Sequence, residues 1–343
     1  MRDIKTAPLS ELEQFFTENG YPRFRAKQVA DWLKKGVTSF DEMKNLPLSL
    51  RESLKKEFVI PTAEIVRKQV SKLDGTVKYL FRLDDGEFIE GVVMQYHHGS
   101  TICVSTQVGC KMGCTFCATG KSGFSRSLLP SEMIAQIESA QKDLNVRISN
   151  VVLMGMGEPF DNYDNVIAFL KLVSSESSLN IGMRHITVST CGIVPRMYDF
   201  ADLGLQVGLS VSLHAPNDEA RSRTMPINRR YPIAEVIKAS KYYVEKTHRR
   251  ITFEYALIEG ENDTQEHARE LSQLLHGLLC HVNLIPVNNV TGSGYKKSSL
   301  KRQQAFADQL AALGINATIR RTLGSDIDAS CGQLKRNFMK GDV

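Results

Sequence analysis

Residues 101–117 read TICVSTQVGCKMGCTFC, so an apolar segment with the alternation of a β-strand runs directly into three closely spaced cysteines. These are Cys110, Cys114 and Cys117, in the spacing C-x3-C-x2-C. A 4Fe-4S cluster is normally held by four thiolates, so three thiolates on one short loop would leave one iron open to a substrate or cofactor. Glycines beside the cysteines allow the backbone of such a loop to approach a cluster closely.

A structural zinc ion is the main alternative ligand of this loop. It takes four protein ligands, usually from a second Cys-x2-Cys or a histidine pair. The nearest histidines, His97 and His98, precede the cysteines at the end of another strand-like segment, which disfavours zinc but leaves it open. The chain holds seven cysteines, and this odd number favours metal binding or thiol chemistry over a disulfide framework.

Beyond the cysteines, strand-like and helix-like segments alternate. The strand-like segments are VVLMG, HITVST, VGLSVSL, ITFEYALI, HVNLIPV and ATIRR, and helical stretches such as YDNVIAFLKLVSS and IAEVIKASKYYVEK separate them. A repeated βα pattern predicts a parallel sheet, open or closed into a barrel. The polar motifs MGEP, CG, HAPND and NN each follow a strand, which indicates an active site at the carboxyl end of the sheet.

We expect an α/β protein of four parts. Residues 1–62 read as helices rich in Arg and Lys, and residues 63–100 read as three strands with period-two alternation and DG turns. Residues 101–322 are the predicted core, a partial (βα)6 barrel of six strands. Residues 323–343 read as an irregular tail that closes over the barrel mouth and carries Cys331.

The composition is ordinary for a soluble globular protein, with 42% hydrophobic and 24% charged residues. The net charge of +5 comes from 43 basic and 38 acidic residues, and such a mild excess indicates a polyanionic partner only where the positive charge is clustered. The first residues lack the apolar run of a signal peptide, and no stretch approaches the ~18 apolar residues of a membrane span. We therefore expect a cytoplasmic protein with no membrane partner.

The cysteine loop resembles the cluster-binding motif of the radical S-adenosylmethionine superfamily, and MGEP at residues 156–159 resembles the motif with which that superfamily holds the methionine amino group. The wider chain is similar to the RlmN/Cfr family of RNA adenine methyltransferases, from about residue 9 to 335. The resemblance is carried by FRAKQVADWL, GCKMGCTFCATGKSGF, VVLMGMGEPFDNYDNV, HITVSTCGIVP, VSLHAPND, RSRTMPIN, HVNLIPVN and GSDIDASCGQL. It implies a radical S-adenosylmethionine barrel with the N-terminal helices as an RNA-binding accessory domain.

The resemblance also implies roles for particular residues. It makes Cys110, Cys114 and Cys117 the ligands of one 4Fe-4S cluster. It implies contacts to S-adenosylmethionine from Gly157, Glu158, Ser189, Ser212, Leu213, His214 and Asn288. It implies three catalytic residues, with Glu90 as a proton acceptor, Cys331 as a methyl carrier and Cys103 as its partner thiol. Cys191, where the family more often has serine, and Cys280 are predicted to be packed core residues.

The implied reaction is radical methylation of C2 of a specific adenosine in 23S rRNA, with two S-adenosylmethionine molecules per turnover. One molecule methylates Cys331, and the second yields a radical that takes a hydrogen from the S-methyl group. The carbon radical adds to the adenine as a covalent protein–RNA adduct, which Cys103 helps to resolve by forming a disulfide with Cys331. An adenosine in the tRNA anticodon loop stays open as a second substrate. The other implied partner is an electron donor such as flavodoxin or ferredoxin, and we expect a monomer.

Two alternatives stay open. Cfr members methylate C8 of the same adenosine and confer antibiotic resistance, and they usually have GEA where this chain has Gly157, Glu158 and Pro159, which favours C2. The other alternative is a non-catalytic RNA-binding protein whose cysteine loop is a zinc knuckle. Clustered basic residues are candidates for phosphate contacts, although such faces are often only solvated surface. They are Arg23, Arg25, Lys27, Lys34, Lys35, Arg320, Arg321, Lys335 and Arg336.

Overall fold

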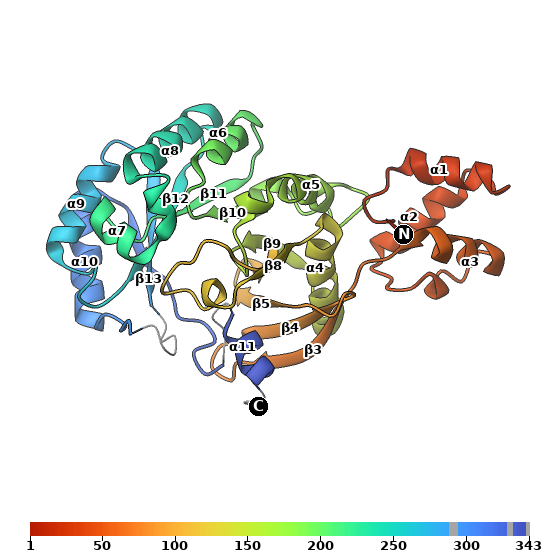
Figure 1. Cartoon of the computed structure of the whole chain (residues 1–343), viewed down its shortest axis with the longest axis horizontal. Coiled ribbons are helices and arrows are strands. Elements are labelled where there is room, and N and C mark those ends of the chain that lie inside the picture. Colours follow the sequence, from red (N-terminus) through yellow and green to blue (C-terminus); the bar gives the residue numbers. More distant parts are fainter. Residues whose placement is uncertain (288–293, 328–331, 341–343) are drawn as a thin grey trace.

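The computed structural model describes residues 1–287, 294–327 and 332–340, and its centre is one ten-stranded sheet (Figure 1). The strand order is β14-β13-β12-β11-β10-β9-β6-β5-β4-β3. Strands β6 and β9 to β14 are parallel, whereas β3 to β6 pair antiparallel. The predicted α/β class is confirmed. Asn288 and Cys331 lie outside the described residues.

The parallel strands coincide with the segments that the sequence predicts as strands. They are β6 (Gly99–Cys103), β9 (Ile148–Leu153), β10 (Ile186–Thr190), β11 (Gly208–Ser212), β12 (Ile251–Leu257), β13 (Cys280–Pro286) and β14 (Ala317–Ile319). The core thus has seven parallel strands rather than the predicted six, and the three-residue β14 at the edge falls in the predicted segment ATIRR. The helices between them are α4 (Pro130–Leu144), α5 (Tyr163–Ser174), α6 (Val194–Asp202), α7 (Asp218–Thr224), α8 (Ile233–Thr247), α9 (Gln265–Leu275) and α10 (Leu300–Ala312). Short 3-10 helices are η3 (Pro159–Asn162), η4 (Met183–His185) and η5 (Pro226–Arg229).

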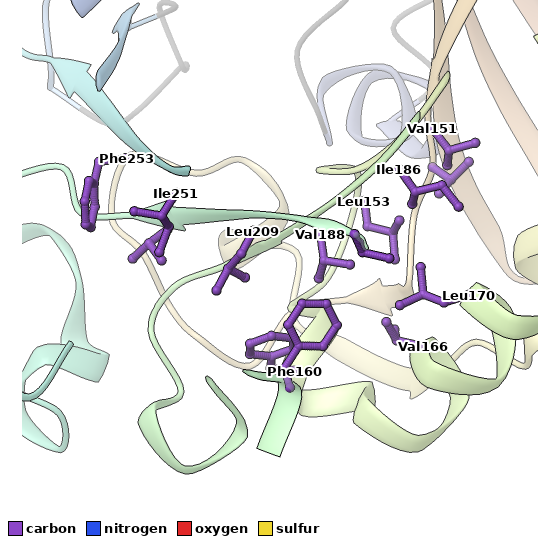
Figure 2. Packing of buried hydrophobic residues seen from close by; sticks show 14 of the residues in the cluster. Val151, Leu153, Phe160, Val166, Leu170, Ile186, Val188, Leu209, Ile251 and Phe253 are labelled. Atoms are coloured by element: carbon purple, nitrogen blue, oxygen red, sulfur yellow. The ribbon is translucent and has the colours of Figure 1, made fainter. Parts of the chain in front are cut away.

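Alternation along the strands separates two faces of the sheet. Residues such as Val188, Leu209 and Phe253 point to the helices and are fully buried, as Figure 2 shows for strands β9 to β12 and helix α5. Burial of each such side chain stabilises the fold by about 1.5–3 kcal/mol relative to exposure. The intervening positions carry polar residues, among them Ser210 and Glu254. The apolar face therefore builds the core and leaves the opposite face for chemistry.

The strands β3 (Ala63–Val70), β4 (Val77–Leu83) and β5 (Phe88–Tyr96) are present as predicted. They continue the main sheet, because β5 pairs antiparallel with β6 through Val92 opposite Cys103. The proposed division into four domains stays a prediction, since one sheet runs across the boundary at residue 100.

The N-terminal helices have a hydrophobic core of their own and lie at one end of the molecule (Figure 1). They are α1 (Leu9–Glu18), α2 (Arg25–Lys34) and α3 (Leu48–Glu57), with η1 (Phe40–Glu42) between the last two. Their core includes Phe16, Val29 and Leu54, each 0% exposed. A parallel pair of two-residue strands, β1 (Arg2–Asp3) and β2 (Phe58–Val59), joins the ends of this unit.

The prediction of an irregular tail is wrong for residues 333–340, which form helix α11 (Gln333–Lys340). Tertiary packing explains the helix, because Leu334 is buried and the ring of Phe338 lies 5.4 Å from that of Phe88 on β5. A helix this short is marginal in water without such contacts. None of the described helices is long and apolar enough to cross a membrane.

Candidate active site

The cysteine loop is closed at its base by two short strands, β7 (Gln107–Gly109) and β8 (Phe124–Ser127). Gly109 has a φ of 81°, and a Cβ there would lie 2.0 Å from the carbonyl oxygen of Gly123, so no other residue fits. The amide of Cys110 donates to the same oxygen at 2.9 Å. The three cysteines follow on this pinned loop, which ends in the 3-10 helix η2 (Thr119–Lys121).

The loop holds its thiols in a setting that suits a positively charged metal group. Burial, together with the neighbouring charges of Glu158 and Cys117, raises the pKa of Cys110 to about 12. Burial and the charges of Cys117 and Cys110 also raise the pKa of Cys114. Such thiols stay protonated at neutral pH until a metal displaces the protons. Three half-buried thiols whose charges act on one another therefore fit a thiolate-ligated iron–sulfur cluster.

The loop after β9 presents Gly157 and Glu158 close to these cysteines. Gly157 has a φ of 107°, and a Cβ would meet the Cβ of Gln107 at 2.6 Å. The Glu158 amide donates to Gln107 Oε1 at 2.9 Å, and the Glu158 carboxylate accepts from the amides of Phe160 at 3.0 Å and Cys191 at 2.7 Å. Burial raises the pKa of Glu158. Glu158 thus ties the β9 and β10 loops together beside the cysteines.

Ser189 is the penultimate residue of β10 and Ser212 is the last residue of β11, and Leu213 and His214 follow directly after β11. His214 has a φ of 58°, is buried, and accepts a hydrogen bond at Nδ1 from the Ala256 amide. Burial lowers the pKa of His214 to about 3, so the ring is neutral with its proton on Nε2. Its ring packs edge-on to Phe116 of the cysteine loop, 4.9 Å between centroids. Of the residues predicted to contact S-adenosylmethionine, His214 therefore packs against the cysteine loop and Glu158 lies close to Cys110.

Arg221 is a site residue that the sequence analysis did not identify. It is 0% exposed and donates to the carbonyl oxygens of Cys191 at 2.6 Å, Leu213 at 3.1 Å and Ser212 at 3.3 Å. Its charge also acts on Cys114 in the direction that lowers that thiol's pKa. Arg221 begins the motif RSRTMPIN, but a buried arginine and a solvated one on a helix look alike in sequence. Arg221 holds the loops after β10 and β11 in place beneath the cysteines.

A second set of polar side chains that the sequence pattern does not reveal lies on the sheet face below these loops. Glu254 is buried on β12 and accepts from Ser210 Oγ at 2.8 Å and Asn283 Nδ2 at 2.7 Å. Burial raises the pKa of Glu254. Strand alternation predicts that Ser210, Glu254 and Asn283 face away from the core. Only the register in which β11, β12 and β13 pair brings the three side chains together. This hydrogen-bond network makes that face of the sheet polar.

Glu90 and Cys103 lie on the neighbouring strands β5 and β6, further along the same face of the sheet. Glu90 is 2% exposed and forms an ion pair with the buried Lys78 at 2.5 Å. Cys103 is buried with Val92 and Met94, and Leu323 of the tail packs against this group. Cys191 and Cys280 are both buried, as predicted. The structure thus brings the two predicted residues Glu90 and Cys103 together.

The comparisons with known proteins agree with this site. The model of the "Radical SAM superfamily" matches residues 104–272, and that of the "Ribosomal RNA large subunit methyltransferase N-terminal domain" matches residues 3–60. A crystal structure of a radical SAM methyltransferase from Sphaerobacter thermophilus superposes with a TM-score of 0.92 at 45% identity, over 97% of this chain and 99% of that one.

Two curated relatives extend the match to full length. The probable dual-specificity RNA methyltransferase RlmN of Alkaliphilus oremlandii is 54% identical over 98% of both chains. Its counterpart in Clostridium novyi is 51% identical over the full length of both. The fold and the site are those of a radical S-adenosylmethionine enzyme. The chain belongs to the RlmN family of RNA methyltransferases, which excludes the non-catalytic zinc-knuckle alternative and implies a 4Fe-4S cluster and S-adenosylmethionine.

Gly157→Ala should disrupt the site, because the new side chain would need both a positive φ and the space of Gln107. We expect a loss of about 2–5 kcal/mol in the free energy of unfolding and weakened S-adenosylmethionine binding. Urea denaturation and equilibrium dialysis measure the two effects. Gly86→Ala is the matched control, because Gly86 also has a positive φ, of 85°, but no atom within 4 Å of the added Cβ. Equal losses for both variants would contradict the steric argument.

Proposed function

We propose that this protein methylates C2 of a specific adenosine in 23S rRNA through an S-methylcysteine on Cys331. The observation that carries the proposal is the position of Gly332, the residue after Cys331. A Cβ on Gly332 would lie 2.7 Å from the amide nitrogen of Thr119, two residues after Cys117. This supports a tail that delivers Cys331 to the cluster loop.

The described residues suit both cofactors. Cys110, Cys114 and Cys117 would hold one 4Fe-4S cluster, and the loops after β9 to β11, with Asn288, would hold S-adenosylmethionine. When bound, these groups supply the methyl group and the radical that activates it, with two S-adenosylmethionine molecules per turnover. Arg221 and Glu158 would keep the surrounding loops in place, and the neutral His214 would add packing and a hydrogen-bond donor without charge.

The proposed roles of the two thiols are supported by the position of Cys103 in the sheet register. Cys331 would carry the methyl group as a thioether and link covalently to the adenine, while Glu90 accepts a proton. Cys103 would resolve the adduct by forming a disulfide with Cys331. Cys103 lies opposite Val92, and Glu90, which accepts the Gly332 amide, lies two residues before Val92 on the same face. This spacing of roughly 7 Å along β5 supports an encounter of the two thiols.

Product analysis tests the assignment to C2. The enzyme would be reconstituted without oxygen and supplied with S-adenosylmethionine, a reductant and an rRNA fragment, and the nucleosides would be analysed by mass spectrometry. 2-Methyladenosine is the expected product, and 8-methyladenosine would show the Cfr-type reaction instead. Glu158 is followed by Pro159 rather than the alanine usual in Cfr, which favours C2.

Dual specificity, the electron donor, assembly and location complete the proposal. The curated relatives are named dual-specificity RNA methyltransferases, which supports a tRNA adenosine as a second substrate. A flavodoxin or ferredoxin would supply electrons. We further propose a monomer that acts in the cytoplasm without a membrane partner. The same product assay with a tRNA anticodon stem-loop tests the second substrate.

We propose that helix α2 and the turn before it contact RNA. Phe24 is 56% exposed with the Arg25 guanidinium 5.0 Å from its ring, and the Lys35 ammonium lies 4.8 Å from the Trp32 ring. Cations beside exposed aromatic rings are typical of surfaces that stack bases and bind phosphates. Lys335 suits this role less well, because its side chain is only 16% exposed.

Neutralising Arg23, Arg25 and Lys27 together should weaken RNA binding, because fewer phosphate contacts form and fewer counterions are therefore released on binding. The slope of log K against log salt should become less negative by up to about 2–3, while cofactor cleavage without RNA persists. Filter binding across a salt series measures the slope. The matched control neutralises the exposed residues Lys238, Lys241 and Lys246 of α8. Unchanged RNA affinity in the variant with Arg23, Arg25 and Lys27 neutralised would show that α2 is ordinary solvated surface.

A further inference from the structure

The carboxylate of Glu90 binds the start of helix α11. Its Oε2 accepts from the Gly332 amide at 2.6 Å and from Lys78 Nζ at 2.5 Å, and its Oε1 accepts from the Lys335 amide at 2.6 Å. A helix N-terminus presents amides without intrahelical partners and a positive dipole end, so an anion there is favourable. Glu90 therefore caps α11 from a strand more than 240 residues earlier in the chain.

Lys78 completes this arrangement from strand β4, where its side chain is 0% exposed. Removing one member of a buried ion pair leaves an uncompensated charge, whereas apolar residues in place of both are often equally stable. Core stability alone therefore does not require a Lys78–Glu90 pair. The contacts to the Gly332 and Lys335 amides give the pair a specific task, which is to hold the tail.

The same tail contacts the cluster loop and the β3–β4 turn. Gly332 has a φ of 81°, and a Cβ there would meet both the amide nitrogen and Oγ1 of Thr119 at 2.7 and 2.8 Å. On the other side of Cys331, Asp326 accepts from Ser71 Oγ at 2.6 Å and the Lys72 amide at 2.8 Å. The tail is thus attached to the sheet extension both before and after Cys331.

We propose that Lys78 and Glu90 form a docking site for the N-terminus of α11, and that Lys78 is a positioning residue for Cys331. Acting through Glu90, Lys78 keeps Gly332 against Thr119 and so sets where Cys331 enters the active site. The inference deepens the proposed function and rests on Cys331 as the methyl carrier. It also means that Glu90 releases the tail amides before it accepts a proton from a substrate, because those amides occupy both carboxylate oxygens.

Two measurements on the reconstituted holoenzyme test this proposal. Lys78→Met should raise amide deuterium exchange in residues 332–340 about tenfold or more, since bonds to a charged group are lost or weakened. Single-turnover methylation of Cys331, followed by mass spectrometry, should slow by a similar factor at unchanged iron content. Lys68→Met is the matched control and should leave both rates unchanged, because Lys68 lies on the neighbouring strand β3 and is paired with Asp143 of α4.

Gly332→Ala supplies a second variant that leaves Lys78 and Glu90 intact and still displaces the tail from Thr119. It should reproduce both effects, and it decides the matter should Lys78→Met not fold. Unchanged exchange in Gly332→Ala would overturn the docking site. Faster exchange with unchanged Cys331 methylation would overturn the positioning role. RNA methylation by Cys331→Ala would instead overturn the proposed function and leave the docking result standing.

Discussion

Cys331→Ala is expected to produce neither methylated protein nor a covalent adduct with RNA, while its 4Fe-4S cluster still assembles. The variant lacks the sulfur proposed to carry the methyl group, and the three proposed cluster ligands lie on a separate loop. Denaturing gels with labelled RNA and intact-protein mass spectrometry measure adduct and methylation. Cys280→Ala should behave as wild type, because Cys280 is packed in the core on β13.

The companion variant Cys103→Ala separates the two thiols. It keeps the carrier but lacks the thiol proposed to resolve the adduct, so covalent protein–RNA adduct should accumulate. The location of Cys103 beside Val92, Met94 and Leu323 of the tail supports this expectation. An adduct in Cys331→Ala, or none in Cys103→Ala despite methylated Cys331, would overturn the assignment.

Alanine at any one of Cys110, Cys114 or Cys117 should abolish the brown chromophore and all turnover, because each thiolate is proposed to hold one iron. Iron and sulfide analysis after anaerobic reconstitution measures the loss. Burial raises the pKa of Cys110 to about 12, so the thiol is protonated throughout the physiological range and cluster uptake should release protons. Reconstitution should therefore weaken as the pH falls.

Cys191→Ala is the control for this series. Cys191 is buried next to the site, but it holds Glu158 through its backbone amide and accepts from Arg221 through its carbonyl oxygen, and alanine keeps both groups. Its iron content should stay near that of wild type. Loss of the cluster in Cys191→Ala would show that the ligand assignment is incomplete.

Much of the fold could be predicted because it depends on local pattern. Period-two alternation marked the strands of the extension, and the βα alternation marked the parallel strands from β6 to β14. The tail was the failure, because α11 depends on Leu334 and Phe338 packing against distant residues. The residue pattern of the tail does not reveal which distant residues it packs against.

The candidate site divides in the same way. Cys110, Cys114 and Cys117 could be recognised because a cluster motif lies within one short loop, and Gly157 and Glu158 because their motif follows directly on a strand. Arg221 and Lys78 could not be recognised, because their partners lie on other loops and strands.

The sequence by itself determined the alternating strands and helices, the three-cysteine loop and the family to which they point, because each depends on residues near one another in the chain. Only the packing of distant segments buries Arg221 against the loops after β10 and β11 and joins Glu90 to both Lys78 and the tail. A buried charge is tolerated only where partners from distant segments surround it. Strand register and helix packing assemble those partners, and neither can be read from local spacing.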